Sequence, residues 1–246
     1  MVNKSMTDYV IVTGASKGLG LAICQQAAEQ GYGVIAIARQ LSEPFKIVQQ
    51  SYPDLVSFHS ADLADLDKLS ELCKLLIKQY GRPYALVNNA AAGHDGVLAT
   101  MPNSAIEHLM RLNIQAPILL SKYLVRSMLL NRKGRIINIS SIIAKTGFNG
   151  LSVYAASKAA LEGFSKSLAR EVGKAGITVN CVAPGYMQTD MTSSLQGDKL
   201  ESVKRRSPLG KLATVDDAAS MVMYLLSEQA SSITGTVMTV DAGSTA

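Results

Sequence analysis

Short apolar runs alternate along this chain with segments in which apolar residues recur every three or four positions. Most of the short runs are rich in β-branched residues and are apolar at successive positions rather than at alternate ones. That pattern is typical of strands that are covered on both faces of a sheet. It predicts strands over residues 9–13, 33–38, 56–61, 85–88, 135–140, 177–183 and 236–240.

The segments between these runs have helical spacing, and they predict helices over residues 19–30, 65–80, 104–130, 153–175 and 215–226. Thr214 and Asp217 resemble a capping box at the start of the last helix. Repeated strand–helix–strand order predicts a parallel sheet. We therefore expect a single α/β domain over residues 1–246, with a doubly wound, Rossmann-like fold of about seven parallel strands and helices on both faces.

The least regular part of the chain covers residues 185–208. A loop of this length in a compact domain is usually a functional lid or partly mobile. We expect residues 190–208 to form a flexible loop beside the substrate.

Composition excludes several classes of protein. The 246 residues are 48% hydrophobic and 17% charged, which favours a large core over disorder. No apolar run reaches membrane-spanning length and no apolar signal core follows the first residue, so we expect a cytoplasmic protein with no membrane partner. The three cysteines form no CxxC pair and the three histidines lack metal-ligand spacing, which predicts neither a disulfide framework nor a metal site.

The net charge of +5 comes without the Lys/Arg runs that mark nucleic-acid binding, so no nucleic-acid partner is expected. The densest basic stretch contains Arg126, Arg132, Lys133 and Arg135. Two interpretations stay open for it. It could be a solvated helix end near the negative pole of the helix dipole, or a landing site for an acidic partner.

A glycine-rich turn follows the first predicted strand. Residues 13–20 read Thr-Gly-Ala-Ser-Lys-Gly-Leu-Gly and lead directly into a helix. Glycines permit a tight turn and a close backbone approach to phosphate, and the helix N-terminus supplies N–H donors. This position in the chain favours dinucleotide binding over a simple strand end. The expected phosphate cradle consists of Gly14, Ser16, Lys17, Gly18, Leu19 and Gly20.

The charge near this turn bears on the choice of cofactor. Sites specific for NAD usually carry an acidic residue after the second strand, where it holds the ribose 2′-hydroxyl. Here the second strand is followed by Arg39, and the turn carries Lys17. Two cations and no acid at that place favour a 2′-phosphate, and hence NADP(H), over two solvated surface charges.

A second constellation suggests proton transfer. Tyr154 and Lys158 are four residues apart on a predicted helix and therefore share one face. A nearby ammonium group is expected to lower the pKa of a phenol, and the lysine can also hold ribose hydroxyls. Ser141 follows a predicted strand at the carboxyl edge, where open α/β sheets bind ligands. A half-buried tyrosine beside a lysine occurs often by chance, so the conjunction with Ser141 and the glycine-rich turn carries the argument.

With these residues assembled, the chain resembles the short-chain dehydrogenase/reductase family over nearly its whole length. The matching pieces are the glycine-rich turn, Asn88-Asn89-Ala90, Asn113, Ser141, Tyr154 with Lys158, and Pro184-Gly185 followed by Thr189. Within the family it is most similar to the 3-oxoacyl-[acyl-carrier-protein] reductases. The segments that carry this similarity are residues 163–172 and 176–180, together with 182–185, 189–192 and 233–235.

The resemblance implies a role for each matching residue. Tyr154 would be the general acid, Ser141 would orient the substrate carbonyl, and Lys158 would bind ribose. Asn113 would hold a water that links Lys158 to solvent. The remaining cofactor contacts would come from Asp62 and Leu63 at the adenine, Asn89 at the ribose, and Pro184, Gly185, Met187 and Thr189 at the nicotinamide.

The same resemblance implies an NADPH-dependent ketoreductase that acts on a 3-oxoacyl thioester carried by acyl-carrier protein, and a homotetramer. Arg132 matches one basic position that receives the carrier, whereas a second such position falls on Ala175, next to Lys174. Two alternatives stay open: a dehydrogenase of another small alcohol or ketone, such as a sugar or steroid, and a dinucleotide-binding protein without catalysis.

Overall fold

A seven-stranded, all-parallel sheet forms the centre of the computed structural model, which describes residues 8–188, 201 and 204–246. The strand order is β3-β2-β1-β4-β5-β6-β7. The predicted parallel α/β fold is confirmed. The strands are β1 (Tyr9–Thr13), β2 (Gly33–Ala38), β3 (Val56–Ser60), β4 (Ala85–Asn88), β5 (Gly134–Ile139), β6 (Ile177–Pro184) and β7 (Val237–Val240).

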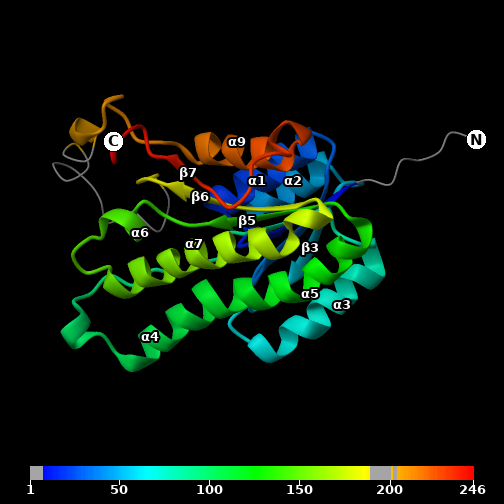
Figure 1. The fold of residues 1–246 in the computed structure, drawn as a ribbon, viewed down its shortest axis with the longest axis horizontal. Helices are drawn as coiled ribbons and strands as arrows, with labels where there is room; N and C mark the ends of the chain where they lie inside the picture. The colour runs from blue at the N-terminus through cyan, green and yellow to red at the C-terminus, as the bar shows by residue number, and fades with distance from the viewer. Residues whose placement is uncertain (1–7, 189–200, 202–203) are drawn as a thin grey trace, which may run out of the picture.

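Helices cover both faces of the sheet, as Figure 1 shows. On one face lie α1 (Gly18–Glu29), α2 (Glu43–Ser51) and α9 (Val215–Leu226), and on the other lie α3 (Leu69–Tyr80), α5 (Ala116–Asn131) and α7 (Ser152–Val172). Within β1, Val10 and Val12 pack into the first layer while Ile11 packs into the second. Alternate side chains of a strand point to opposite faces, so a strand between two helical layers must be apolar at every position.

The strand order reverses direction at the β1–β4 pair. From β1 the chain builds outward through β2 and β3, and it then returns to place β4 on the other side of β1. In doubly wound sheets, ligands bind at the carboxyl ends of the strands beside such a reversal. Both the glycine-rich turn after β1 and the end of β5 lie along that edge.

Helices α2 and α6 (Ile143–Thr146) have no counterpart in the sequence prediction. Helix α2 begins after Ser42, whose hydroxyl accepts a hydrogen bond from the backbone N–H of Phe45. The short helix α6 directly follows the loop that carries Ser141. Both are short, and short helices give little periodicity for a sequence pattern to detect.

The single helix predicted over residues 104–130 is wrong in detail. The structure has α4 (Asn103–Met110), a π-helical segment (Arg111–Gln115) and then α5. π-Helical turns often occur at functional sites. The predicted capping box of Thr214 and Asp217 is confirmed, with both reciprocal hydrogen bonds present.

Most of the expected flexible loop, residues 190–208, lies outside the described part of the chain. Its described end includes Ser207, whose hydroxyl donates to the carbonyl of Ala242. Among the residues that the structure covers, no helix has the length and hydropathy needed to cross a membrane. Nor does that part of the chain gather three or more His, Cys, Asp or Glu side chains as a metal site would require.

Candidate active site

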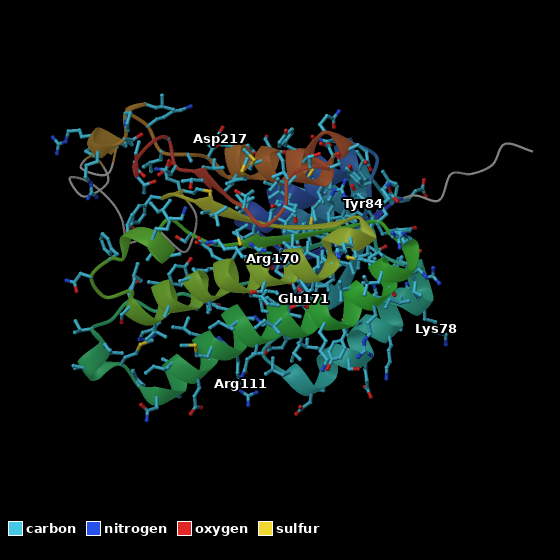
Figure 2. The ribbon with its side chains drawn as sticks, viewed as in Figure 1. Lys78, Tyr84, Arg111, Arg170, Glu171 and Asp217 are labelled. Atoms are coloured by element: carbon cyan, nitrogen blue, oxygen red, sulfur yellow. The ribbon has the colours of Figure 1, made fainter. Side chains whose placement is uncertain are left out.

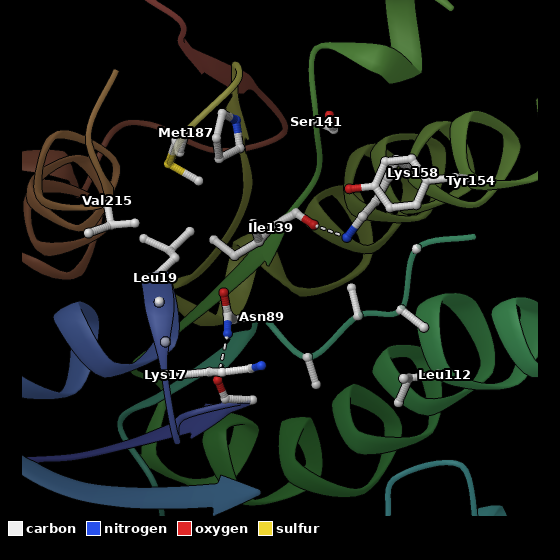
Figure 3. Close-up of a pocket in the computed structure, with 18 of the residues that line it drawn as sticks. Lys17, Leu19, Asn89, Leu112, Ile139, Ser141, Tyr154, Lys158, Met187 and Val215 are labelled. Carbon is white, nitrogen blue, oxygen red and sulfur yellow. Dashed lines mark hydrogen bonds between the residues drawn. The ribbon is translucent and has the colours of Figure 1, made fainter. Parts of the chain in front are cut away.

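One open cleft of about 1720 Å³ runs along the carboxyl edge of the sheet. Its walls include the glycine-rich turn at one end and the face of α7 that carries Tyr154 and Lys158 at the other. Figure 3 shows Lys17 and Leu19 across the cleft from these two side chains. The two constellations that the sequence separates by more than a hundred residues therefore face one cavity.

The glycines of the turn are required by its backbone. Gly14 has φ +66° and Gly18 has φ +55°, a left-handed conformation that side chains with a Cβ rarely adopt. Gly20 permits close packing instead, because a Cβ on it would lie only 2.2 Å from the carbonyl oxygen of Gly14. The turn is thus compact, with the N-terminus of α1 directed at the cleft.

Asn89 holds this turn in place. Its side-chain amide donates to the carbonyl oxygens of Thr13 at 2.9 Å and of Gly14 at 3.2 Å. Its backbone N–H in turn donates to the Thr13 hydroxyl at 2.9 Å. Asn89 also lines the cleft, so it can both brace the turn and face a bound ligand (Figure 3).

The expected adenosine-binding residues gather at the same end. Lys17, Arg39, Asp62 and Leu63 all line the cleft. Arg39 is exposed and follows β2, while Leu63 is buried and presents an apolar wall. The Asp62 carboxylate accepts a hydrogen bond from the backbone N–H of Ala64 at 3.0 Å, which fixes the turn after β3.

At the other end, Ser141, Tyr154 and Lys158 come together. Ser141 lies two residues beyond β5, and its Oγ accepts a hydrogen bond from the N–H of Ile143 at 3.3 Å. Tyr154 and Lys158 lie one turn apart on α7 and both line the cleft, with their polar ends directed to its middle (Figure 3). The Lys158 Nζ is 5.6 Å from the centre of the Tyr154 ring and donates to the carbonyl oxygen of Ile139 at 2.8 Å.

The pKa of Tyr154 does not follow the sequence expectation. Burial raises it above the ordinary value, and a hydrogen bond with Ser141 acts in the opposite direction. The ammonium group of Lys158 was expected to lower it, but that amine is bonded to Ile139 rather than to the phenol. Burial lowers the pKa of Lys158 itself to about 8.

Asn113 lies in the π-helical segment and is fully buried. Its side-chain oxygen accepts from the N–H of Ala92 at 2.9 Å, and its amide donates to the Ala92 carbonyl at 2.9 Å and to the Ser157 hydroxyl at 3.1 Å. The described lining of the cleft includes its neighbour Leu112 but not Asn113. The side chain therefore joins the loop after β4 to helix α7, behind the face that carries Tyr154 and Lys158.

The residues expected at the nicotinamide follow β6. Pro184, Gly185 and Met187 line the cleft, whereas Thr189 lies outside the described residues. Gly185 donates its N–H to the Val240 carbonyl at 2.9 Å, and a Cβ on it would come within 2.7 Å of the Asp241 Cβ. Close packing against the C-terminal segment thus favours glycine at this position.

Known proteins share the sequence family and the fold of this chain. The family model described as Enoyl-(Acyl carrier protein) reductase matches residues 14–245. The 3-oxoacyl-[acyl-carrier-protein] reductase FabG of Escherichia coli is 36% identical over 237 residues, covering 95% of each chain. FabG of Rickettsia bellii is 37% identical over 233 residues, again with 95% of each chain covered. The chain belongs to the short-chain dehydrogenase/reductase family.

A solved structure from Beutenbergia cavernae, described as an NAD(P)-dependent gluconate 5-dehydrogenase with bound NADP, has a TM-score of 0.91. It is 32% identical and the match covers 97% of both chains. This member of the short-chain dehydrogenase/reductase family therefore shares its fold with an NADP-bound relative over 97% of its length.

Residues outside the predicted site support it from behind. The Ser42 hydroxyl donates to the carbonyl of Ser16, which ties the start of α2 to the glycine-rich turn. Its signal was present, because Ser42 is followed by Glu43 and Pro44 and these residue types mark helix starts. Ser140 and Glu162 form a buried hydrogen bond at the other end of the cleft, which no sequence pattern indicated.

The basic residues between Arg126 and Arg135 lie in different environments. Arg135 is 3% exposed and, together with Lys133, faces the Glu228 carboxylate, so this end is not a solvated helix terminus. Arg132 is exposed at the end of α5 and donates to the backbone carbonyl of Lys174 at 3.2 Å. Arg132 and Lys174 therefore form one exposed basic pair outside the cleft.

Proposed function

We propose that this protein is an NADPH-dependent ketoreductase that converts a 3-oxoacyl thioester into the 3-hydroxyacyl product. The observation that carries this proposal is a single cleft that joins the glycine-rich turn to Ser141, Tyr154 and Lys158. This chain is 36–37% identical to FabG reductases and has the acid and its neighbours in place. Both observations support reduction of a carbonyl over nucleotide sensing without catalysis.

The residues present fit the dinucleotide. The turn brings α1 to the cleft with two left-handed glycines, and the cleft volume exceeds the several hundred Å³ that small ligands need. Lys17 and Arg39 would hold the 2′-phosphate of NADPH, and Asp62 with Leu63 would flank the adenine. When bound, the cofactor supplies a hydride to the carbonyl carbon.

The proton that adds to the carbonyl oxygen comes from a side chain of the protein. Tyr154 would donate it as general acid, and its raised pKa keeps the phenol protonated at neutral pH. Ser141 would donate a hydrogen bond to the same oxygen and so orient the ketone. Hydride at carbon and proton at oxygen together give the alcohol, with the cofactor oxidised.

Other residues would support this chemistry. Lys158 would leave or share its bond to Ile139 to hold ribose hydroxyls, and Asn89 would line that side of the cleft. Pro184, Gly185, Met187 and Thr189 would hold the nicotinamide. Asn113 would hold a water that links Lys158 to solvent and so replenishes the proton.

Apolar lining at the substrate end supports an acyl chain. Ile142, Phe148 and Leu151 line that part of the cleft, and the Phe148 ring lies 6.1 Å from the Tyr186 ring in an edge-to-face contact. A hydrocarbon chain gains free energy on such a wall, whereas a polyhydroxylated sugar would lose hydrogen bonds to water there. This favours the thioester over a sugar such as gluconate.

We further propose that the acyl chain arrives on acyl-carrier protein, that Arg132 and Lys174 attract this acidic partner, and that residues 1–246 act as one domain within a homotetramer. A cytoplasmic location is part of the same proposal. Light scattering tests the tetramer.

NADPH oxidation in the presence of an acetoacetyl thioester tests the proposed reaction. Carrier-bound, coenzyme A-bound and free ketones should be compared, with gluconate and NADP⁺ assayed in the reverse direction. Turnover that is fastest with the carrier-bound thioester supports the proposal. Faster turnover of a sugar would contradict it, and NADPH binding without turnover of any carbonyl would favour the sensor.

A further inference from the structure

Glu162 is a buried carboxylate that the proposed chemistry does not use. It is 7% exposed and lies on α7 four residues after Lys158, which itself follows Tyr154 by four. Residues at this spacing share one face of a helix. The face of α7 that supplies the acid and the lysine therefore continues with a carboxylate, and a buried carboxylate is costly unless it is hydrogen-bonded.

The partner of Glu162 is Ser140, whose hydroxyl donates to the Glu162 Oε1 at 2.9 Å. Ser140 lies between Ile139 and Ser141, which both contact side chains of the proposed site. Its predecessor Ile139 accepts the hydrogen bond from Lys158, and its successor Ser141 bonds Tyr154. The backbone N–H of Ser140 donates to the Val182 carbonyl at 2.7 Å, so this segment is held to both α7 and β6.

The end of β5 thus makes hydrogen bonds to α7 at successive turns of the helix. The bonds of Tyr154 and Lys158 involve groups that must exchange partners when a ketone and a ribose bind. The bond between Ser140 and Glu162 involves neither of those side chains, and Glu162 is not part of the described cleft lining. The Ser140 hydroxyl also donates, at 3.4 Å, to the backbone carbonyl of Lys158, which adds a second link to α7. The bond between Ser140 and Glu162 can therefore stay intact throughout the reaction. It would keep Ser141 at a fixed distance from Tyr154 and Lys158.

We propose that Glu162 is a positioning residue that, through Ser140, holds Ser141 at its working distance from Tyr154 and Lys158. The inference rests on the proposed ketoreductase function. A displacement of about 1 Å between reacting groups can lower a rate roughly 100-fold, so a bond outside the cleft can control turnover.

Kinetics of Glu162→Leu and Glu162→Gln test the proposal. The leucine variant should lose at least about tenfold in kcat with little change in KM for NADPH or ketone, since the loss is of geometry. The glutamine variant keeps an acceptor for Ser140 and should recover to within about threefold of the parent. Unchanged kcat in the leucine variant would overturn the inference and leave the ketoreductase assignment standing.

Tyr84→Phe is the matched control. It also removes a buried hydrogen bond, from the Tyr84 hydroxyl to the Leu226 carbonyl, but at the opposite edge of the sheet (Figure 2). This variant should lower Tm without changing kcat. If it lowers kcat as much as Glu162→Leu does, then the loss reflects stability alone and the positioning role is wrong.

A double-mutant cycle with Ser140→Ala tests whether Glu162 acts through Ser140. If Glu162 acts through Ser140, then Glu162→Leu should change kcat by less than about twofold in the Ser140→Ala background, because coupled residues are not additive. If Glu162→Leu lowers kcat as much in the Ser140→Ala background as in the parent, then Glu162 does not act through Ser140. Ser140→Ala removes only one oxygen and supplies the kinetic comparison if the leucine variant does not fold.

Crystal structures separate this inference from the proposed function. Should the parent reduce no ketone, the ketoreductase assignment fails, and the bond from Lys158 Nζ to the Ile139 carbonyl becomes the readout. Its loss in the leucine variant with retention in the glutamine variant supports the positioning role. Retention in both variants contradicts it.

Discussion

The Nζ atom of Lys158 donates a hydrogen bond to the backbone carbonyl of Ile139, at a distance of 2.8 Å. This bond connects α7 to the end of β5 beside the cleft. The amine is almost fully buried, and burial lowers its pKa from 10.5 to about 8. The same side chain is thus destabilised in its charged form and placed where a ribose would bind.

The pKa of Lys158 predicts how stability depends on pH. Between pH 8 and pH 10.5 the unfolded chain holds a proton that the folded chain has released, so folding becomes more favourable as pH rises through this window. Below pH 8 both states are protonated and the full cost of burying the charge is present. Lys158→Met keeps the apolar stem and should be more stable than the parent at pH 7, by up to about 3 kcal/mol.

Urea unfolding at pH 7 and pH 10 measures this difference, and taking variant minus parent cancels the other titrating groups. The advantage of the methionine variant should shrink toward pH 10. An advantage that grows with pH would contradict the lowered pKa.

Tyr154→Phe removes the proposed acid and leaves the ring. We expect kcat to fall by about 10²- to 10⁴-fold, the usual contribution of general acid catalysis, with NADPH affinity nearly unchanged. Stopped-flow NADPH oxidation and fluorescence titration measure the two quantities. Turnover at the parent rate would exclude Tyr154 as the proton donor.

Arg39→Asp should shift cofactor preference toward NADH. The substitution removes a cation from the expected 2′-phosphate position and supplies an acceptor for a ribose hydroxyl. The ratio of kcat/KM for NADPH over NADH should fall by about 10- to 100-fold, the value of a charged hydrogen bond. Lys78→Asp makes the same charge change on α3, away from the cleft (Figure 2), and should leave the ratio as it is.

Ser42→Ala should weaken cofactor binding from a position that sequence reasoning missed. The hydroxyl caps α2 and also donates to Ser16 in the glycine-rich turn. Loss of an N-cap costs about 1 kcal/mol of stability, and a looser turn should raise KM for NADPH more than KM for ketone. Ser51→Ala removes a hydroxyl bond to the Ile47 carbonyl at the other end of α2 and should not affect either KM.

Arg132→Glu tests the carrier surface. The substitution reverses charge at an exposed site outside the cleft, so an acidic carrier should bind less well while a free thioester is unaffected. KM for a carrier-bound substrate should rise about tenfold or more, and KM for the coenzyme A thioester should stay constant. Equal effects on both substrates would place the change in the cleft and count against carrier docking there.

The strand pattern was readable in the chain because strands between two helical layers must be apolar at every position. All seven strands match their predicted bounds to within one residue, and β1, β2 and β4 match at both ends. The helix predicted over residues 104–130 was less accurate. The π-helical segment is only five residues long, which is too short for a periodicity pattern to separate it from the α-helices on either side.

Local spacing also placed Tyr154 and Lys158 on one helical face, since the pitch of a helix depends only on the backbone. Whether their polar atoms would meet depends on packing between distant segments. The amine bonds Ile139 instead of the phenol, and burial governs the pKa of both groups. Desolvation is a property of the assembled fold, so the expected lowering of the tyrosine pKa was wrong.

The chain alone therefore carries the order of its elements, the glycine-rich turn and the identities of the side chains proposed to react, because these follow from backbone geometry and residue chemistry at short range. Assembly of the sheet settles the rest. It brings Asn89 onto Gly14, Ser42 onto Ser16 and Glu162 onto Ser140, and these hydrogen bonds join residues up to 75 positions apart. Only packing sets such distances, and with them the shape and the dielectric environment of the cleft.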